Sequence, residues 1–198
     1  MAHCLKHACS AGATLAALLV IGLARGNFNA AEETPFKITG VGTGPTGLPL
    51  PGDAPRSHPS TGTATHLGKY AGDGTVQTDF ADFVPPNTLA GEFGSGTPYV
   101  FTAADGSKLV TWYGRTDHGA AEPGTFELTI LGATGGGQLI VEALFIAEFV
   151  IQPDDSTGRF AGATGSWIMI ANTEPFVLGS SDSLAYWWDG EGRINLKN

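Results

Sequence analysis

The segment Gln138–Gln152, QLIVEALFIAEFVIQ, decides the fold class of this 198-residue chain. Its apolar residues recur at every second position from Val141 to Ile151, which is the spacing of side chains on one face of a β-strand. Glycines precede the segment and Pro153 follows it, so turn residues mark both ends. The segment therefore predicts a strand, although the glutamate and leucine within it would also suit a helix.

The opposite face of this strand is too apolar to be left in water. It carries two carboxylates among aliphatic residues, namely Ile140, Glu142, Leu144, Ile146, Glu148 and Val150. A strand that is apolar on both faces is usually covered on both faces. Two interpretations stay open: another part of the same chain covers this face, or a second copy does so in a homo-oligomer, a dimer or a trimer.

Strand patterns continue on both sides of this segment. Thr125–Leu131 (TFELTIL) alternates in the same way, and Pro98–Ala103 with Lys108–Arg115 predicts a hairpin around an Asp-Gly turn. Further strands are predicted at Pro35–Val41, Ala64–Ala71, Thr75–Val84, from Ser166 onward, at Ser183–Trp188 and at Gly192–Leu196, with a turn at residues 72–74. We expect an all-β fold, a single antiparallel β-barrel of about eight to ten strands, without a helix.

The N-terminal region predicts export. Residues 1–31 form a signal peptide, because Lys6 precedes the apolar run Ala8–Ala24 and small residues offer cleavage after Ala24 or Ala31. The run is too short and too rich in small residues for a membrane anchor. Residues 32–63 are predicted as an N-terminal strand and a Gly/Pro-rich extended segment, and residues 64–198 as the barrel domain. The protein is expected in the periplasm or outside the cell.

The charge and the cysteine content limit the classes of partner and binding site that this chain can have. The signal peptide holds two basic residues and both cysteines, so the mature chain has eight basic and 19 acidic residues, a balance of −11, and no disulfide. Such an acidic chain has no basic stripe for nucleic acid and is not attracted to anionic membrane surfaces. The sequence also offers no metal-ligand spacing and no phosphate-binding loop, so we expect neither a metal nor another cofactor.

No catalytic signature is present, and the catalytic residues are therefore unknown. Aromatic residues are the best candidates for a functional surface, since an aromatic-lined cavity suits an apolar small molecule. The candidate ligand-binding residues are His66, Tyr70, Trp112, Tyr113 and Trp167. His66 is placed in a strand on the same face as Tyr70, whereas His58, in the Pro-rich segment, is expected in solvent. Core filling is the default role for the aromatic residues, and ligand binding is the alternative.

Three segments, Ala64–Tyr70 (ATHLGKY), Phe101–Leu109 (FTAADGSKL) and Gly158–Gly165 (GRFAGATG), occur in an order that resembles a diffuse group of exported, largely uncharacterised bacterial proteins. The last segment also resembles the barrel shared by allene oxide cyclases and dirigent proteins. The resemblance covers about residues 60–173 and rests mostly on turn residues. It implies an antiparallel barrel with a small-molecule-sized interior, in a superfamily whose plant members cyclise substrates or guide coupling reactions, often as trimers and without metal or nucleotide.

Three functions are compatible with these observations. The first is an exported, non-catalytic β-barrel that acts as a binding or structural module, with an apolar small molecule as its ligand. The second is a cofactor-free isomerase or cyclase of the allene oxide cyclase type, with His66 and Tyr113 as the polar groups that steer the substrate. The third is a small outer-membrane β-barrel, which the glycines and charges within the strands disfavour. The sequence favours the first function and therefore a protein that is not an enzyme.

Overall fold

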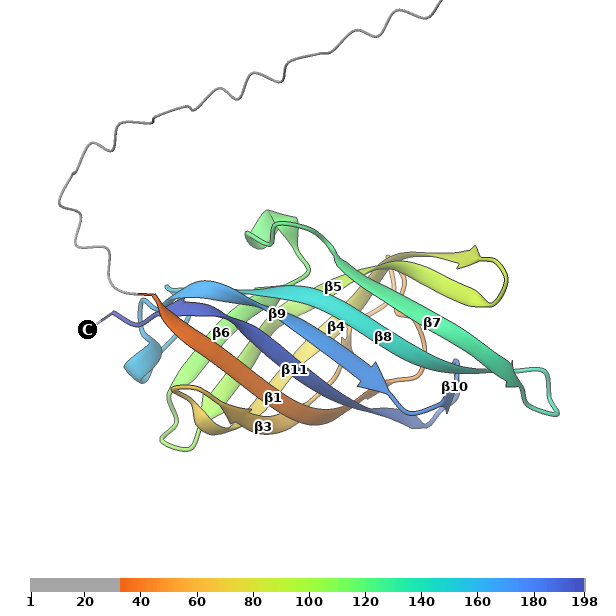
Figure 1. Ribbon diagram of the computed structural model, residues 1–198, viewed down its shortest axis with the longest axis horizontal. Helices are drawn as coiled ribbons and strands as arrows, with labels where there is room; N and C mark the ends of the chain where they lie inside the picture. The colour runs from red at the N-terminus through yellow and green to blue at the C-terminus, as the bar shows by residue number, and fades with distance from the viewer. Residues whose placement is uncertain (1–32, 198) are drawn as a thin grey trace, which may run out of the picture. The chain divides into compact units, whose positions relative to one another are not determined.

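The computed structural model describes residues 33–197, which form a closed antiparallel β-barrel (Figure 1). The predicted signal peptide and its cleavage sites lie outside the described residues. The barrel wall has eight positions, and seven of them are single strands: β1 (Thr34–Pro45), β3 (Ser60–Ala64), β4 (Gly68–Val84), β5 (Thr88–Ala103), β8 (Leu139–Ile151), β9 (Thr164–Thr173) and β11 (Ser183–Asn195). Among residues 33–197 there is no α-helix. The prediction of an all-β antiparallel barrel is confirmed.

The eighth position of the wall is shared by two strands. β6 (Lys108–Tyr113) and β7 (Gly124–Ala133) both pair with β5 on one side and with β8 on the other, β6 at one end of the barrel and β7 at the other. The chain between them leaves the wall and contains the short 3₁₀ turn η1 (Thr116–His118). The excursion is closed at its base, because the amide of Gly124 donates to the carbonyl of Gly114 at 3.3 Å.

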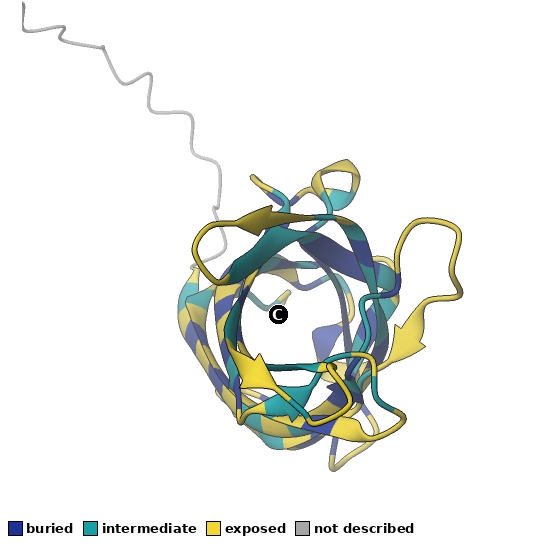
Figure 2. Ribbon diagram, turned by 90° about the vertical axis from the view of Figure 1, so that its right-hand side faces the viewer, coloured by how far each residue is buried: buried dark blue, intermediate teal, exposed yellow. Residues whose placement is uncertain are grey.

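The ring is completed by the long pairing of β4 with β5, which runs from Tyr70 opposite Ala103 to Val84 opposite Thr88. Figure 2, which looks along the barrel from the end where β10 (Phe176–Val177) lies, shows the closed ring. Two short segments add to the wall: β2 (Arg56–Ser57) pairs with β4, and β10 pairs with β8. A second 3₁₀ turn, η2 (Gly158–Phe160), precedes β9. Its Phe160 is fully buried in the core.

The alternation that predicted β8 corresponds to its two faces in the barrel. Val141, Ala143, Ala147, Phe149 and Ile151 are buried inside. On the outer face Glu142 and Ile146 are exposed, whereas Leu144, Glu148 and Val150 are partly buried. The excursion after β6 covers part of this face, since the side chain of Glu148 accepts a hydrogen bond from the amide of Ala121 at 2.7 Å. A segment of the same chain therefore covers the outer face of β8 at one end of the strand.

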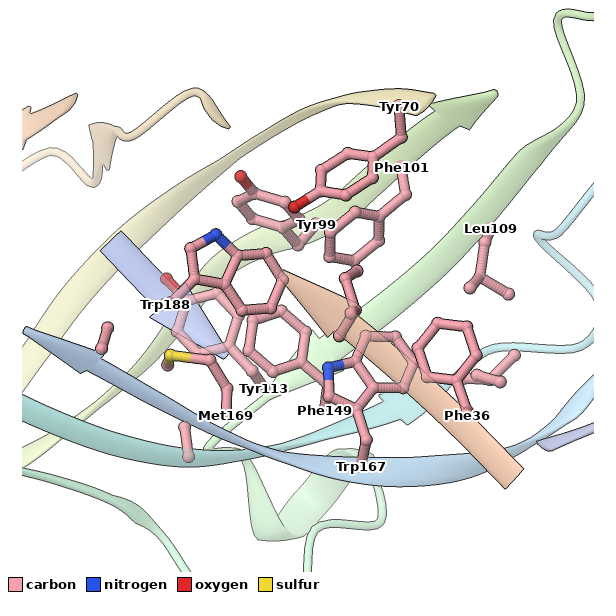
Figure 3. Packing of buried hydrophobic residues seen from close by; sticks show 14 of the residues in the cluster. Phe36, Tyr70, Tyr99, Phe101, Leu109, Tyr113, Phe149, Trp167, Met169 and Trp188 are labelled. Atoms are coloured by element: carbon pink, nitrogen blue, oxygen red, sulfur yellow. The ribbon is translucent and has the colours of Figure 1, made fainter. Parts of the chain in front are cut away.

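Aromatic side chains fill the end of the barrel where β1 begins and β11 ends (Figure 3). Phe149 lies between two tryptophans, stacked on Trp167 at 5.3 Å and on Trp188 at 5.8 Å between ring centroids. Phe36 and Phe101 pack around this stack and are fully buried. Aromatic pairs add stabilisation to that of the apolar area they bury, so this cluster is the main core of the protein.

The predicted turn at residues 72–74 is wrong, since these residues lie within β4. A Cβ atom on Gly72 would stand 2.8 Å from Cε1 of Tyr99, and a Cβ atom on Gly74 would stand 2.5 Å from its Cδ2. Both glycines leave room for the ring of Tyr99 against the strand. Composition alone does not tell a glycine in a turn from a glycine in a strand that makes room for a neighbouring ring.

Residues 32–63 were predicted to precede the barrel domain, but the barrel already begins with β1 and not at residue 64. β1 continues to Pro45 and β3 starts at Ser60, so both belong to the wall. The chain from Thr46 to Pro59 lies against β4, with which β2 pairs, at the end of the barrel that faces the viewer in Figure 2. Hydrogen bonds hold it there: the Thr46 hydroxyl donates to the carbonyl of Ser180 at 2.7 Å, and the amide of Thr78 donates to the carbonyl of Pro49 at 2.8 Å.

Candidate functional site

A cavity of about 100 Å³ lies inside the barrel, and residues 46–49 and His58 of segment 46–59 form part of its lining. Its wall is mostly apolar and includes Phe93, Phe126, Phe145, Met169, Ala171 and Leu184, and segment 46–59 contributes Leu48 and Pro49. Trp188 and Phe149 form its floor, where the cavity meets the packed aromatic core. The barrel interior is thus solid at one end and hollow at the other.

Most of the polar groups on the cavity wall come together around His58. Its Nε2 lies 2.7 Å from the hydroxyl oxygen of Tyr113, and its Nδ1 lies 3.4 Å from that of Tyr186. The ring also packs against Tyr99, with ring centroids 4.9 Å apart. We call these four residues the His58–tyrosine cluster.

The cluster is tied to the main chain of its surroundings. The Tyr113 hydroxyl lies 3.0 Å from the carbonyl of Thr75, and the Tyr186 hydroxyl lies 3.2 Å from the carbonyls of His58 and Pro59. The Tyr99 hydroxyl lies 2.7 Å from the Ser60 hydroxyl. Every polar atom of the cluster therefore already has a partner within the protein, which fixes the rings in place.

Burial keeps the cluster uncharged at neutral pH. Loss of solvation lowers the pKa of His58 to about 4, and the nearby carboxylate of Asp73 offsets only part of this shift. Loss of solvation also raises the pKa of Tyr99 to about 12 and raises the pKa values of Tyr113 and Tyr186 well above their usual range. Among the described residues that line the cavity there is no Asp, Glu, Lys or Arg. The site offers shape, aromatic surface and neutral hydrogen-bonding groups.

Strand alternation explains how the sequence places the three tyrosines. Tyr99 in β5, Tyr113 in β6 and Tyr186 in β11 share the inward parity of the buried residues of their strands. His58 belongs to the segment between β2 and β3, and its amide donates to the carbonyl of Gly74 at 3.0 Å. This hydrogen bond anchors the segment beside β4.

Only one of the five candidate ligand-binding residues lines the cavity, and that residue is Tyr113. Tyr70 and Trp167 are buried in the packed core, and the Tyr70 hydroxyl donates to the carbonyl of Thr39 at 3.1 Å. Trp112 points outward and stacks on His118, with ring centroids 3.8 Å apart.

Two expectations about histidines are corrected. His66 is not in a strand beside Tyr70: it is exposed in the turn between β3 and β4, with a left-handed φ of 67°. His58 is not a solvated residue of a linker, because its ring lies on the cavity wall. Tyr99 and Tyr186 were signalled by strand parity, whereas the position of His58 depends on how its segment folds back onto the barrel.

No group of three or more residues that could hold a metal ion occurs within residues 33–197. In the same range, no helix is long and apolar enough to cross a membrane.

Comparison with known proteins finds no matching family model, no matching curated protein and no matching solved structure. We therefore infer the function of this protein from the geometry of the cavity and from the barrel architecture.

Proposed function

We propose that this chain is an exported, non-catalytic β-barrel that binds a small, uncharged, apolar molecule in the cavity that segment 46–59 helps to line. The observation that carries the proposal is a hollow barrel end whose wall is apolar and whose polar groups are neutral. A mostly apolar cavity favours an apolar guest. A charged ligand would lose its hydration there without gaining an opposite charge.

The size of the cavity limits the ligand. Pockets for drug-sized molecules measure about 300–1,000 Å³, whereas this cavity measures about 100 Å³. An engineered apolar cavity of about 150 Å³ accepts benzene or xenon. We therefore expect a compact ligand no larger than a single ring, unless segment 46–59 moves on binding.

The acidic residues on the outer faces of the strands support this proposal over an outer-membrane barrel. Glu127 and Glu142 are exposed on the outside of neighbouring strands, and Asp189 is exposed on β11. A lipid-facing wall needs a continuous apolar band at these positions. Export is proposed from the apolar N-terminal run and places the protein in the periplasm or outside the cell.

The experiment is a titration of the purified protein with benzene, followed by the shift of its thermal unfolding midpoint and by NMR. Binding to the folded state alone raises the midpoint as the ligand concentration increases. The Ala171→Leu variant fills the cavity from β9 and is expected to abolish the shift. Ala185→Leu makes the same change at an exposed position of β11 and is expected to bind as the wild type does. Equal binding by both variants, or none by the wild type, would refute the proposal.

A cofactor-free isomerase remains the second candidate, because His58 and Tyr113 are in hydrogen-bond contact on the cavity wall. Two observations make it the weaker one. A histidine whose pKa is lowered to about 4 is a poor base at neutral pH, and a cavity of about 100 Å³ leaves no room for a flexible substrate to fold. Turnover of an apolar epoxide that is lost in Tyr113→Phe would favour this candidate over the first.

A further inference from the structure

A second hollow lies on the outside of the barrel, across β4, β5, β7 and β8. It is a groove of about 430 Å³. Its apolar lining comes from Phe80 and Val84 on one side and from Leu144 and Ile146 on the other. Phe80 and Val84 are each 48% exposed and Ile146 is 39% exposed, so the groove is open to solvent in the isolated chain.

All the charged side chains that line the groove are acidic. Asp82, Glu92 and Glu127 lie along it, and none of its lining residues is basic. None of the three carboxylates forms an ion pair with another residue in the described range 33–197. The pairing of β5 with β7 sets Ala90 opposite Glu127 and Thr125 opposite Glu92, so the charges are interleaved with the apolar side chains.

The apolar surface continues beyond the groove. Ile146 is opposite Ile170 of β9 in the strand register, and Ile168 and Ile170 are both 47% exposed on the same outer face. The groove itself crosses three strand intervals of about 4.8 Å, from β4 to β8, or roughly 14 Å, and β9 lies further round the curved wall.

A second copy of the chain is a poor occupant. The mature chain has a balance of −11, and a two-fold contact through this face would bring its carboxylates toward their own copies. Like charges brought together at an interface weaken association. The groove instead calls for apolar side chains accompanied by Lys or Arg, which would place cations beside Glu92 and Glu127.

We propose that this outer groove docks a basic amphipathic segment of a partner protein, one that presents apolar and Lys or Arg side chains on the same face. The carboxylates select the charge of the partner and speed the encounter. The apolar side chains supply the buried area. This proposal does not depend on a ligand in the barrel interior.

The test measures binding of a labelled Leu/Lys amphipathic helical peptide of about 14 residues, roughly 20 Å long, to the purified protein by fluorescence anisotropy. A Leu/Glu peptide of the same pattern is the matched probe. We expect binding of the Leu/Lys peptide alone, with an affinity that falls as salt is added. The double change Glu92→Gln and Glu127→Gln is expected to weaken binding by about 3- to 10-fold. Asp154→Asn with Asp155→Asn removes two charges from the exposed turn after β8 and is expected to leave binding unchanged.

A second pair of variants tests the apolar part. Phe80→Ser, inside the groove, is expected to weaken peptide binding at least 10-fold, whereas Phe83→Ser, which is 54% exposed but does not line the groove, is expected to have little effect. Equal binding of the two peptides, or equal behaviour of the two carboxylate pairs, would overturn the proposal. A dimer in sedimentation that Phe80→Ser dissociates, together with no peptide binding, would assign the groove to a second copy and would also overturn it.

Discussion

His58 and Tyr113 meet inside the barrel, with 2.7 Å between the imidazole Nε2 and the phenolic oxygen. One comes from segment 46–59 and the other from the end of β6, so this contact joins that segment to the wall. The contact favours the neutral form of His58, because burial disfavours the charged ring by more than the nearby carboxylate of Asp73 stabilises it.

Acid is therefore expected to destabilise the protein through His58. Its pKa is about 4 in the folded state, against 6.5 for an unperturbed histidine. Between these values the unfolded chain binds more protons, so the free energy of unfolding falls as the pH decreases from about 6.5 to about 4 and is constant with respect to this group above that window. The expected contribution is roughly 3 kcal/mol, measured by urea unfolding at a series of pH values.

The control for this prediction is a comparison of variants, since carboxylates also titrate near pH 4. His58→Gln is expected to remove the pH dependence assigned to the buried ring, whereas His66→Gln, at an exposed turn, is expected to retain it. The same pH profile in His58→Gln as in the wild type would contradict the assignment.

Tyr113→Phe is expected to lower the free energy of unfolding by about 1–3 kcal/mol. The change removes the hydroxyl that lies between His58 and the carbonyl of Thr75 and leaves both with one partner fewer. Tyr70→Phe removes a hydroxyl that donates to the carbonyl of Thr39 but does not contact His58, and it is expected to cost less. Chemical denaturation of the two variants side by side checks the order, and the reverse order would contradict it.

Phe149→Ala is expected to cost about 3–5 kcal/mol of stability, because it removes the ring between Trp167 and Trp188 and leaves a cavity in the core. The near-ultraviolet circular dichroism of the tryptophans should weaken in the same variant. Ile168→Ala, at a position 47% exposed on the outer face, is expected to change stability by no more than about 0.5 kcal/mol. A small effect of Phe149→Ala would show that the aromatic stack is not the main core.

Gly74→Ala is expected to destabilise the protein by about 1–3 kcal/mol. The added methyl group would stand 2.5 Å from Cδ2 and 3.0 Å from the Cα atom of Tyr99, and the backbone atom cannot move aside. Gly47→Ala is the matched control, because a Cβ atom there meets nothing within 4 Å. Its stability should be unchanged or slightly higher, and thermal unfolding of both variants measures the difference.

The alternating strands were predictable because one of their faces is much more deeply buried than the other. Thr125–Leu131 and Gln138–Gln152 appear as β7 and β8, and the Asp-Gly hairpin appears as β5 and β6, with the bounds shifted by a few residues. In these strands the inward side chains are large and apolar, so the pattern in the sequence is the pattern of burial.

β1 was predicted only in part because glycines occupy its inward positions. Gly40 faces Tyr70 and Trp188, and Gly42 faces Tyr186, so the neighbouring strands supply the side chains that fill this part of the barrel. A strand whose inward residues are glycines has no apolar alternation, so its sequence resembles that of a linker.

Only those residues of the candidate site that lie on strands were predictable from the sequence. Tyr113 has the inward parity of its strand, and Trp188 is buried while its neighbour Trp187 is 44% exposed, as strand alternation requires. His58 could not be found in this way. Its position is set by hydrogen bonds between segment 46–59 and strands distant in sequence, which leave no local pattern.

Because β6 and β7 share one position of the wall, we expect the barrel to tolerate a circular permutation of the chain. Thr34 is opposite Ile194, so the two ends of the barrel sequence are neighbours that a short peptide could join. The chain could then be opened in the excursion between Gly114 and Gly124, where both halves are already anchored to β5 and β8. A circularly permuted protein with its new termini at residue 120 would keep every rung of the wall, and it would carry a fused reporter outside the barrel, away from the hollow end.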